Sequence, residues 1–201
     1  MEPQQSPAIL LSGHIATPPD SPKENTMTKR VLIVATHGFE QSELDGPKKA
    51  LEEAGFETVV ASLEPGSITG WKDKNWGDAV AVDVTIDDVE AADYDALLLP
   101  GGQMNPDILR MDDRVIDLIN DFDDLDKPIA AICHAPWLLI EADIVDGRTV
   151  TSWPSIRVDL ANAGADVVDE EVVVDGNLIT SRNPDDVPAF SKALIEALTD
   201  D

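Results

Sequence analysis

Residues 127–140, KPIAAICHAPWLLI, decide the fold that the sequence predicts. The stretch has the pattern of a short buried strand, a sharp turn and an apolar helix, with Cys133, the chain's one cysteine, at the turn. A thiol there lies against the unpaired N–H groups of the helix and at the carboxyl edge of a parallel sheet, where open α/β sheets bind their ligands. Because His134 follows directly, the stretch predicts an enzyme with a cysteine nucleophile.

Strand and helix patterns alternate along the rest of the chain. We therefore expect an α/β fold, a parallel sheet covered by helices on both faces, in one domain over residues 27–201. A small antiparallel excursion is expected at 68–70 with 79–84, and a hairpin at 172–174 with 178–180. The other expected elements are strands at 31–35, 57–62, 95–99, 128–132 and 148–151 and helices at 42–54, 107–122, 155–163 and 185–198.

Residues 1–26 differ from the rest, because they are rich in Pro, Ser and Gln and have no sustained periodicity. They predict a disordered N-terminal extension, which carries His14. The apolar patch at 8–11 lacks a basic leader, so we expect no secretory signal, and Met27 resembles a natural start. The longest apolar runs are too short to cross a bilayer, and we expect a cytoplasmic protein that does not bind membranes.

The chain is strongly acidic, with 40 acidic against 14 basic residues and a net charge of −26. Binding of nucleic acid or of an acidic membrane surface requires clustered Lys and Arg, which are absent from this sequence, so we expect neither partner. The acidity runs through predicted helices and loops alike. It indicates a solvated surface and, more specifically, adaptation to a salt-rich (halophilic) cytoplasm in which counterions screen self-repulsion.

Two further residues are expected near the thiol. Glu40 follows the first strand, and a protonated carboxyl there would donate a hydrogen bond to the thiolate. The plainer alternative is an acid that matches the dipole of the following helix. Gly102 ends the sequence Pro-Gly-Gly after a buried strand, where its N–H and that of His134 could form an oxyanion hole. A simple turn at the end of the strand is the alternative for this glycine pair.

His134 needs a group that orients its imidazole, because adjacent residues do not normally face each other on a helix. Asp107 is the candidate, although Asp near a helix start is common for structural reasons. His37 is a rival base at the same edge of the sheet. The sequence has no phosphate loop or dinucleotide motif, and its three histidines and one cysteine form no spaced cluster, so we expect neither a cofactor nor a metal.

The chain closely resembles the ThiJ/PfpI family, in particular the PfpI-type intracellular proteases. The resemblance covers residues 29–198 and leaves out only the leading tail. The collinear stretches that carry it are AICHAPWLL (131–139), GFE (38–40), GFETV (55–59), LPGG (99–102), TSWPS (151–155), NAGA (162–165) and EVVVDGN (171–177).

The resemblance implies a flavodoxin-like, class I glutamine amidotransferase-like three-layer sandwich with a nucleophile elbow. It also implies that Cys133 is the nucleophile, Glu40 the acid in contact with the thiolate, His134 the adjacent histidine and Gly102 an oxyanion-hole donor. In PfpI-type proteins a carboxylate from a neighbouring subunit completes the triad, which implies a homo-oligomer. Asp107 falls at that position, where the family has a glutamate, so its reach to His134 is shorter.

The implied function is a cysteine hydrolase that acts as a peptidase, a deglycase or a glyoxalase. Its substrates would be peptides, glycated proteins or small carbonyl compounds. A true glutamine amidotransferase is excluded, because its histidine comes late in the chain and none follows His134 here. Two alternatives remain open at this point: a redox-sensing or chaperone-like stress protein that uses the same cysteine, and a purely structural or binding role.

Overall fold

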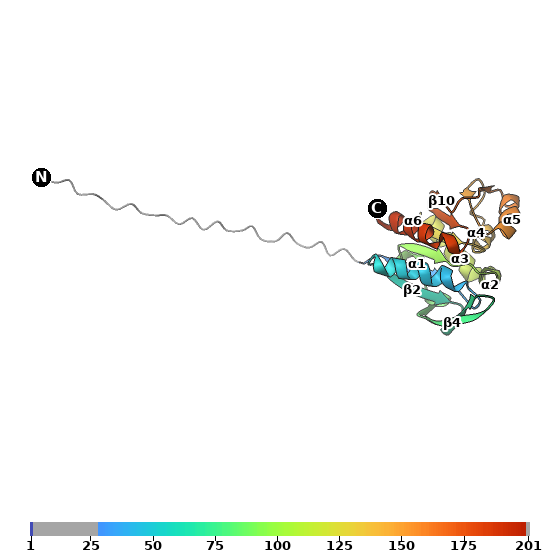
Figure 1. The fold of residues 1–201 in the computed structure, drawn as a ribbon, viewed down its shortest axis with the longest axis horizontal. Helices are drawn as coiled ribbons and strands as arrows, with labels where there is room; N and C mark the ends of the chain where they lie inside the picture. The colour runs from blue at the N-terminus through green and yellow to red at the C-terminus, as the bar shows by residue number, and fades with distance from the viewer. Residues whose placement is uncertain (2–27, 200–201) are drawn as a thin grey trace.

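The structure is a computed structural model that describes Met1 and residues 28–199 (Figure 1). The predicted N-terminal extension therefore lies outside the described residues except for Met1, and so does His14. Within the described part of the chain, no helix is long and apolar enough to cross a membrane.

A mainly parallel sheet forms the centre of the described residues, as the alternating pattern predicts. β11, β7, β6, β1, β2 and β5 run parallel to their neighbours, and β10 pairs antiparallel with β11 at one edge. In spatial order the strands are β10 (Val172–Asp175), β11 (Leu178–Ser181), β7 (Ile129–Ile132), β6 (Ala96–Leu99), β1 (Arg30–Val34), β2 (Glu57–Ser62) and β5 (Val84–Thr85).

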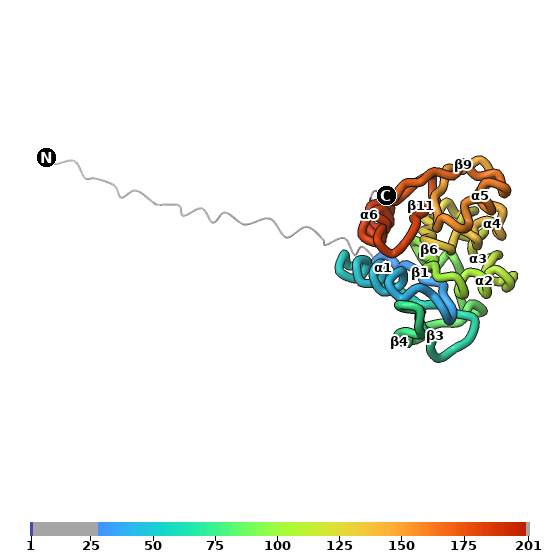
Figure 2. The backbone as a smooth tube through the Cα atoms, turned by 45° about the vertical axis from the view of Figure 1, so that its right-hand side comes forward, coloured from blue at the N-terminus to red at the C-terminus, as the bar shows by residue number. Residues whose placement is uncertain are grey.

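Helices cover both faces of this sheet, so the fold has three layers. α1 (Gln41–Glu53) and α6 (Val187–Thr199) lie side by side on one face (Figures 1 and 2). α3 (Asp113–Asp124), α4 (Pro136–Glu141) and α5 (Arg157–Asn162) cover the other. Side chains alternate between the two cores along each strand, which explains why buried parallel strands are apolar throughout.

The predicted helix at 107–122 is wrong in its length, because two helices occupy this region. α2 (Met104–Leu109) ends before α3 begins at Asp113. The Asp112 side chain accepts a hydrogen bond of 3.1 Å from the Arg114 N–H and so caps a new helix. The apolar pattern continues across Asp112, so the sequence does not show that one helix ends and another begins there.

The antiparallel excursion is confirmed, and its strands extend further than the sequence pattern suggests. β3 (Gly66–Lys72) and β4 (Asn75–Val82) form a hairpin that projects from one side of the molecule (Figure 2). Its two turn residues, Asp73 and Lys74, have φ of 50° and 65°, which fits a tight hairpin turn. The hairpin brings Trp71 toward the carboxyl edge of the sheet.

Short elements complete the described fold. A separate two-stranded parallel sheet joins β8 (Thr149–Val150) and β9 (Asp166–Val167). The 3₁₀ turns are η1 (Ile86–Asp88), η2 (Ala91–Asp93), η3 (Pro154–Ile156) and η4 (Pro184–Asp186). The predicted helices at 155–163 and 185–198 therefore each begin with a 3₁₀ turn before α5 and α6.

Candidate active site

The predicted strand–turn–helix junction is present, with Cys133 at its bend. β7 ends at Ile132, α4 begins at Pro136, and Cys133 has φ of +67°. This left-handed conformation is uncommon for a residue with a side chain, and the surrounding hydrogen bonds hold it. The Cys133 N–H donates to the Ser181 carbonyl at 3.0 Å, and the Ala135 N–H donates to the Ile132 carbonyl at 3.0 Å.

Several predicted residues meet at the thiol. The Cys133 side chain is buried, and its Sγ lies 3.2 Å from Nδ1 of His134. The bend at Cys133 therefore allows two adjacent residues to face each other, as they would not on a regular helix. Burial raises the pKa of the thiol, and the N–H groups of Gly102 and His134, which hydrogen-bond to the sulfur, oppose that shift in part.

Glu43, and not Glu40, is the acid that contacts the thiol, which corrects the prediction for Glu40. The Glu43 side chain is fully buried, accepts a hydrogen bond of 3.0 Å from the Gly101 N–H and interacts with Cys133. Glu40 is half-buried at the rim, and its carboxylate accepts a hydrogen bond from Ser42 Oγ. The reason is that Glu40 precedes α1 with extended backbone, whereas Glu43 lies in its first turn.

A signal for Glu43 was present in the sequence. Glu43, Pro47 and Leu51 are spaced four residues apart and share the buried face of α1. An acid on a buried helix face near a sheet edge is unusual, because burial of a carboxylate is costly.

Burial determines the protonation of both Cys133 and Glu43. Burial raises the pKa of Glu43 to about 8, against the opposing hydrogen bonds from the thiol and the Gly101 and Gly102 N–H groups. Burial, and then repulsion from Glu43, also raises the pKa of the Cys133 thiol. Because two adjacent anions are unfavourable there, the pair retains a proton at neutral pH. Glu43 is therefore protonated at neutral pH, and its carboxyl can donate to the sulfur once the thiol proton has moved to His134.

His134 is held on several sides. Its Nε2 lies 3.4 Å from Ser155 Oγ, and its ring stacks on Trp153 with centroids 5.8 Å apart and planes at 25°. The Trp137 ring lies 5.4 Å away on a tilted plane. Burial lowers the pKa of His134, so the imidazole is neutral at pH 7 and able to accept a proton.

The structure does not bring Asp107 or His37 to this histidine within the described chain. Asp107 lies on the exposed side of α2 and makes no hydrogen bond with His134. Nδ1 of His37 accepts a hydrogen bond of 3.1 Å from the Thr69 N–H on β3 and is exposed. Asp107 therefore does not orient His134 within one copy of the chain, and His37 is hydrogen-bonded to the hairpin instead.

A cavity of about 200 Å³ opens onto the thiol and is lined mainly by apolar atoms. Trp71, from the hairpin, and Trp153 both line it, together with Gln103 and Pro184. The other lining residues are Glu40, Glu43, Gly102, Cys133 and His134. Among the described residues, no three His, Cys, Asp or Glu side chains are arranged to hold a metal ion.

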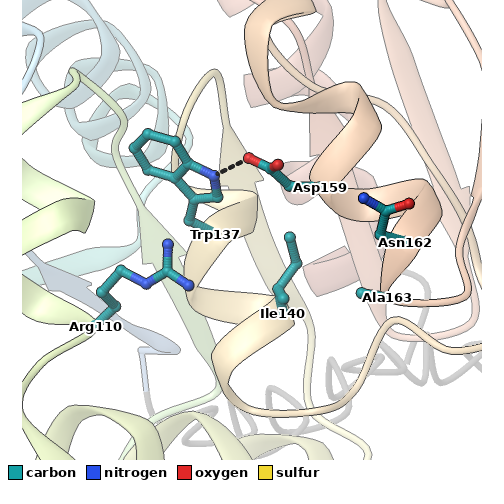
Figure 3. A pocket seen from close by; sticks show the side chains of 6 residues that line it. All are labelled: Arg110, Trp137, Ile140, Asp159, Asn162 and Ala163. Carbon is teal, nitrogen blue, oxygen red and sulfur yellow. Dashed lines mark hydrogen bonds between the residues drawn. The ribbon is translucent and has the colours of Figure 1, made fainter.

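A second groove lies beside Trp137 (Figure 3). The Trp137 indole N–H donates to Asp159 at 2.9 Å, and the Arg110 guanidinium lies 5.7 Å from the indole ring. Arg110 also forms an ion pair with Glu141. The contacts of Trp137 with Asp159 and Arg110 fix its ring next to His134.

Curated proteins of similar sequence cover nearly the whole described domain. "General stress protein 18" of Bacillus subtilis is 50% identical over 173 residues, which is 86% of this chain and 99% of that protein. "Putative cysteine protease YraA" of the same organism is 45% identical over the same shares. "Protein/nucleic acid deglycase 2" of Escherichia coli is 43% identical, again over 86% of this chain and 99% of that protein.

The fold and the sequence profile agree with these relatives. The crystal structure of Drosophila melanogaster DJ-1beta superimposes with a TM-score of 0.79 at 31% identity and covers 87% of this chain and 92% of that one. It confirms the expected flavodoxin-like α/β architecture. The DJ-1/PfpI family profile matches residues 29–197, which include all of the residues placed around the thiol above. The chain therefore belongs to the DJ-1/PfpI family.

Proposed function

We propose that this chain is a cysteine-dependent hydrolase of the PfpI type, in which Cys133 attacks an electrophilic carbonyl carbon. One observation carries the proposal: a single buried sulfur has His134 Nδ1 at 3.2 Å, the Glu43 carboxyl beside it and two N–H groups directed at it. A structural cysteine needs none of these partners. The relatives named as a cysteine protease and a deglycase support the same class of chemistry.

The proposed reaction begins with transfer of the thiol proton to Nδ1 of His134. The Cys133 thiolate then adds to the carbonyl carbon, and the N–H groups of Gly102 and His134 hold the resulting oxyanion. His134 returns its proton to the leaving group, and water hydrolyses the covalent intermediate. Glu43 stays protonated throughout and stabilises whichever form of the sulfur is anionic.

The size of the cavity favours a compact carbonyl group as substrate. A volume of about 200 Å³ between Trp71 and Trp153 fits one modified side chain or a small carbonyl compound. We therefore favour a deglycase or glyoxalase activity on glycated proteins, peptides or free carbonyl compounds, with peptidase activity as the related alternative. We do not propose nucleic acid as a substrate, because the charge of −26 disfavours binding to phosphates. The Escherichia coli relative differs in that its name includes nucleic acid.

The exposed face of α2 supports the homo-oligomer that we expect from the family resemblance. Three apolar side chains on or just after α2 are exposed: Met104, Ile108 and Met111. We propose that this face packs against a second copy, whose Asp107 approaches His134. Sedimentation of an Ile108→Glu variant should then show a smaller species than the wild type. An unchanged sedimentation coefficient for that variant would contradict the interface.

The hydrolase proposal is tested with two substrates in parallel, methylglyoxal-treated N-acetylarginine and a fluorogenic peptide. The wild type should turn over at least one of them, and Cys133→Ala should abolish that turnover. His134→Ala should lower kcat by about 10²–10⁴-fold, the usual contribution of a general base. Turnover that persists unchanged in Cys133→Ala would refute a cysteine mechanism.

A redox-sensing stress role is the second candidate. It is favoured by the relative named "General stress protein 18" and by the acid beside the thiol, which can hydrogen-bond to an oxidised sulfur. The two functions separate in His134→Ala, because peroxide should still oxidise Cys133 there while hydrolysis fails. Intact-mass measurement after peroxide treatment reads the oxidation directly.

A further inference from the structure

The segment Trp153–Ile156, which contains the η3 turn, lies directly against the nucleophile turn. The Trp153 N–H donates to the Cys133 carbonyl at 2.9 Å, and the Trp153 indole stacks on the His134 ring. These two contacts fix the segment relative to the imidazole. Two residues further on, Ser155 Oγ lies 3.4 Å from Nε2 of His134.

The two ring nitrogens of His134 have different tasks. Nδ1 faces the thiol, so it must be the unprotonated nitrogen if it is to accept the thiol proton. The ring proton of the neutral imidazole then sits on Nε2 and requires an acceptor. In the described part of the chain, no carboxylate hydrogen-bonds to His134, and the Ser155 hydroxyl is the group within reach of Nε2.

We propose that Ser155 is the positioning residue for His134: its hydroxyl oxygen accepts the Nε2 proton and keeps Nδ1 directed at Cys133. The proposal rests on the hydrolase function above, since it assigns a role in preparing the same histidine. A hydroxyl that accepts from Nε2 still has its own proton to donate. It can therefore also bridge the imidazole to the short Asp107 side chain that we propose a second copy supplies.

A hydroxyl differs from a carboxylate as a partner, because it orients the ring without adding a negative charge. The titratable groups around the ring are Cys133, Glu43 and Glu40 in the cavity, and Arg110 and Asp159 beyond Trp137. Burial dominates among these influences and lowers the pKa of His134. Loss of the Ser155 acceptor should make the protonated imidazole still less favourable, so the thiolate that accompanies it should form at higher pH.

The test compares Ser155→Ala with two other variants of the full chain. Ser155→Thr keeps a hydroxyl at the same position. Ser152→Ala is the matched control, because Ser152 is buried directly before this segment, but its hydroxyl donates to the Trp153 carbonyl and makes no hydrogen bond with His134. The measurements are kcat and KM, the pH dependence of Cys133 alkylation by iodoacetamide, and the ¹⁵N chemical shifts of the His134 ring. The chain has three histidines, so assignment is simple.

We expect Ser155→Ala to lower kcat about tenfold with KM unchanged, the effect of losing one hydrogen bond to a group that becomes charged. It should also raise the apparent pKa of alkylation and shift the Nε2 resonance, whereas Ser155→Thr restores all three and Ser152→Ala changes none.

Unchanged ring shifts and alkylation in Ser155→Ala would overturn the proposal, as would the same changes in Ser152→Ala. The ring shifts and the alkylation need no substrate, so they still decide the role of Ser155 if the hydrolase activity itself is not found.

Discussion

At the scale of single residues, Glu43 is the least expected part of the site. A fully buried carboxyl is costly when ionised, and its pKa of about 8 means that the folded protein keeps it protonated across most of the physiological range. The residue therefore affects stability as well as the thiol. The same burial that makes it costly keeps its proton in place beside Cys133.

The stability of the wild type should fall more steeply with rising pH than the stability of Glu43→Gln. Between pH 4.5 and about 8 the folded wild type holds a proton on Glu43 that the unfolded chain releases. Its stabilising contribution is complete below pH 4.5 and is lost as the pH rises to 8, by on the order of a few kcal/mol. Urea unfolding at pH 5 and pH 8 should show this loss in the wild type and a clearly smaller one in Glu43→Gln. The same loss of stability between pH 5 and pH 8 in both proteins would contradict a buried, protonated Glu43.

The sequence predicts the site residues that are local to one turn, and it fails for those that depend on geometry across the fold. Cys133, His134 and Gly102 follow a buried strand directly, so their place at the sheet edge can be inferred. The choice between Glu40 and Glu43 depends on the residue at which α1 begins, which patterns leave uncertain by a few residues. Ser155 belongs to a 3₁₀ turn whose path depends on tertiary contacts, and no periodicity marks it.

At the scale of elements, one N-cap, Asp112, decides where a helix of this chain begins. Most strands are predicted within one or two residues, because buried parallel strands are short apolar runs. The region 104–124 is the exception, since the Asp112 cap divides one periodic stretch into α2 and α3. The division places Asp107 on the short helix α2, apart from α3.

We expect Asp112→Ala to destabilise the fold by about 0.5–2 kcal/mol, the usual loss for an N-cap. Asp112 caps α3 and also pairs with Arg114. Asp113→Ala is the control, since this neighbour has a similar charge and makes no cap. Chemical denaturation of both variants measures the difference. Equal stability of the two variants would show that the Asp112 cap does not stabilise the start of α3.

At the scale of the whole molecule, the charge of −26 is the property that the fold does not explain. The predicted fold is confirmed in its layers and in its mainly parallel central sheet, because alternation of strands and helices leaves few other arrangements. The acidic surface adds nothing to that arrangement and opposes compactness through self-repulsion. Salt should relieve this repulsion.

The melting temperature should therefore rise between low-salt buffer and molar KCl, where the screening length falls from tens of ångströms to about 3 Å. Differential scanning calorimetry at several KCl concentrations measures the effect, and sucrose at matched osmolality serves as the control for nonionic stabilisation. A melting temperature that is flat or falls with KCl would contradict adaptation to a salt-rich cytoplasm.

Burial and Glu43 together control the protonation of Cys133. The most direct test is the pH dependence of Cys133 alkylation by iodoacetamide in high salt, for the wild type, Glu43→Gln and Glu40→Gln. Because burial and repulsion from Glu43 raise the pKa of the thiol, we predict an apparent pKa above the ordinary thiol value of about 8.5 in the wild type, lowered in Glu43→Gln because the repulsion is lost, and unchanged in Glu40→Gln. A thiol that titrates near 8.5 in all three proteins would contradict control of its protonation by burial and by Glu43.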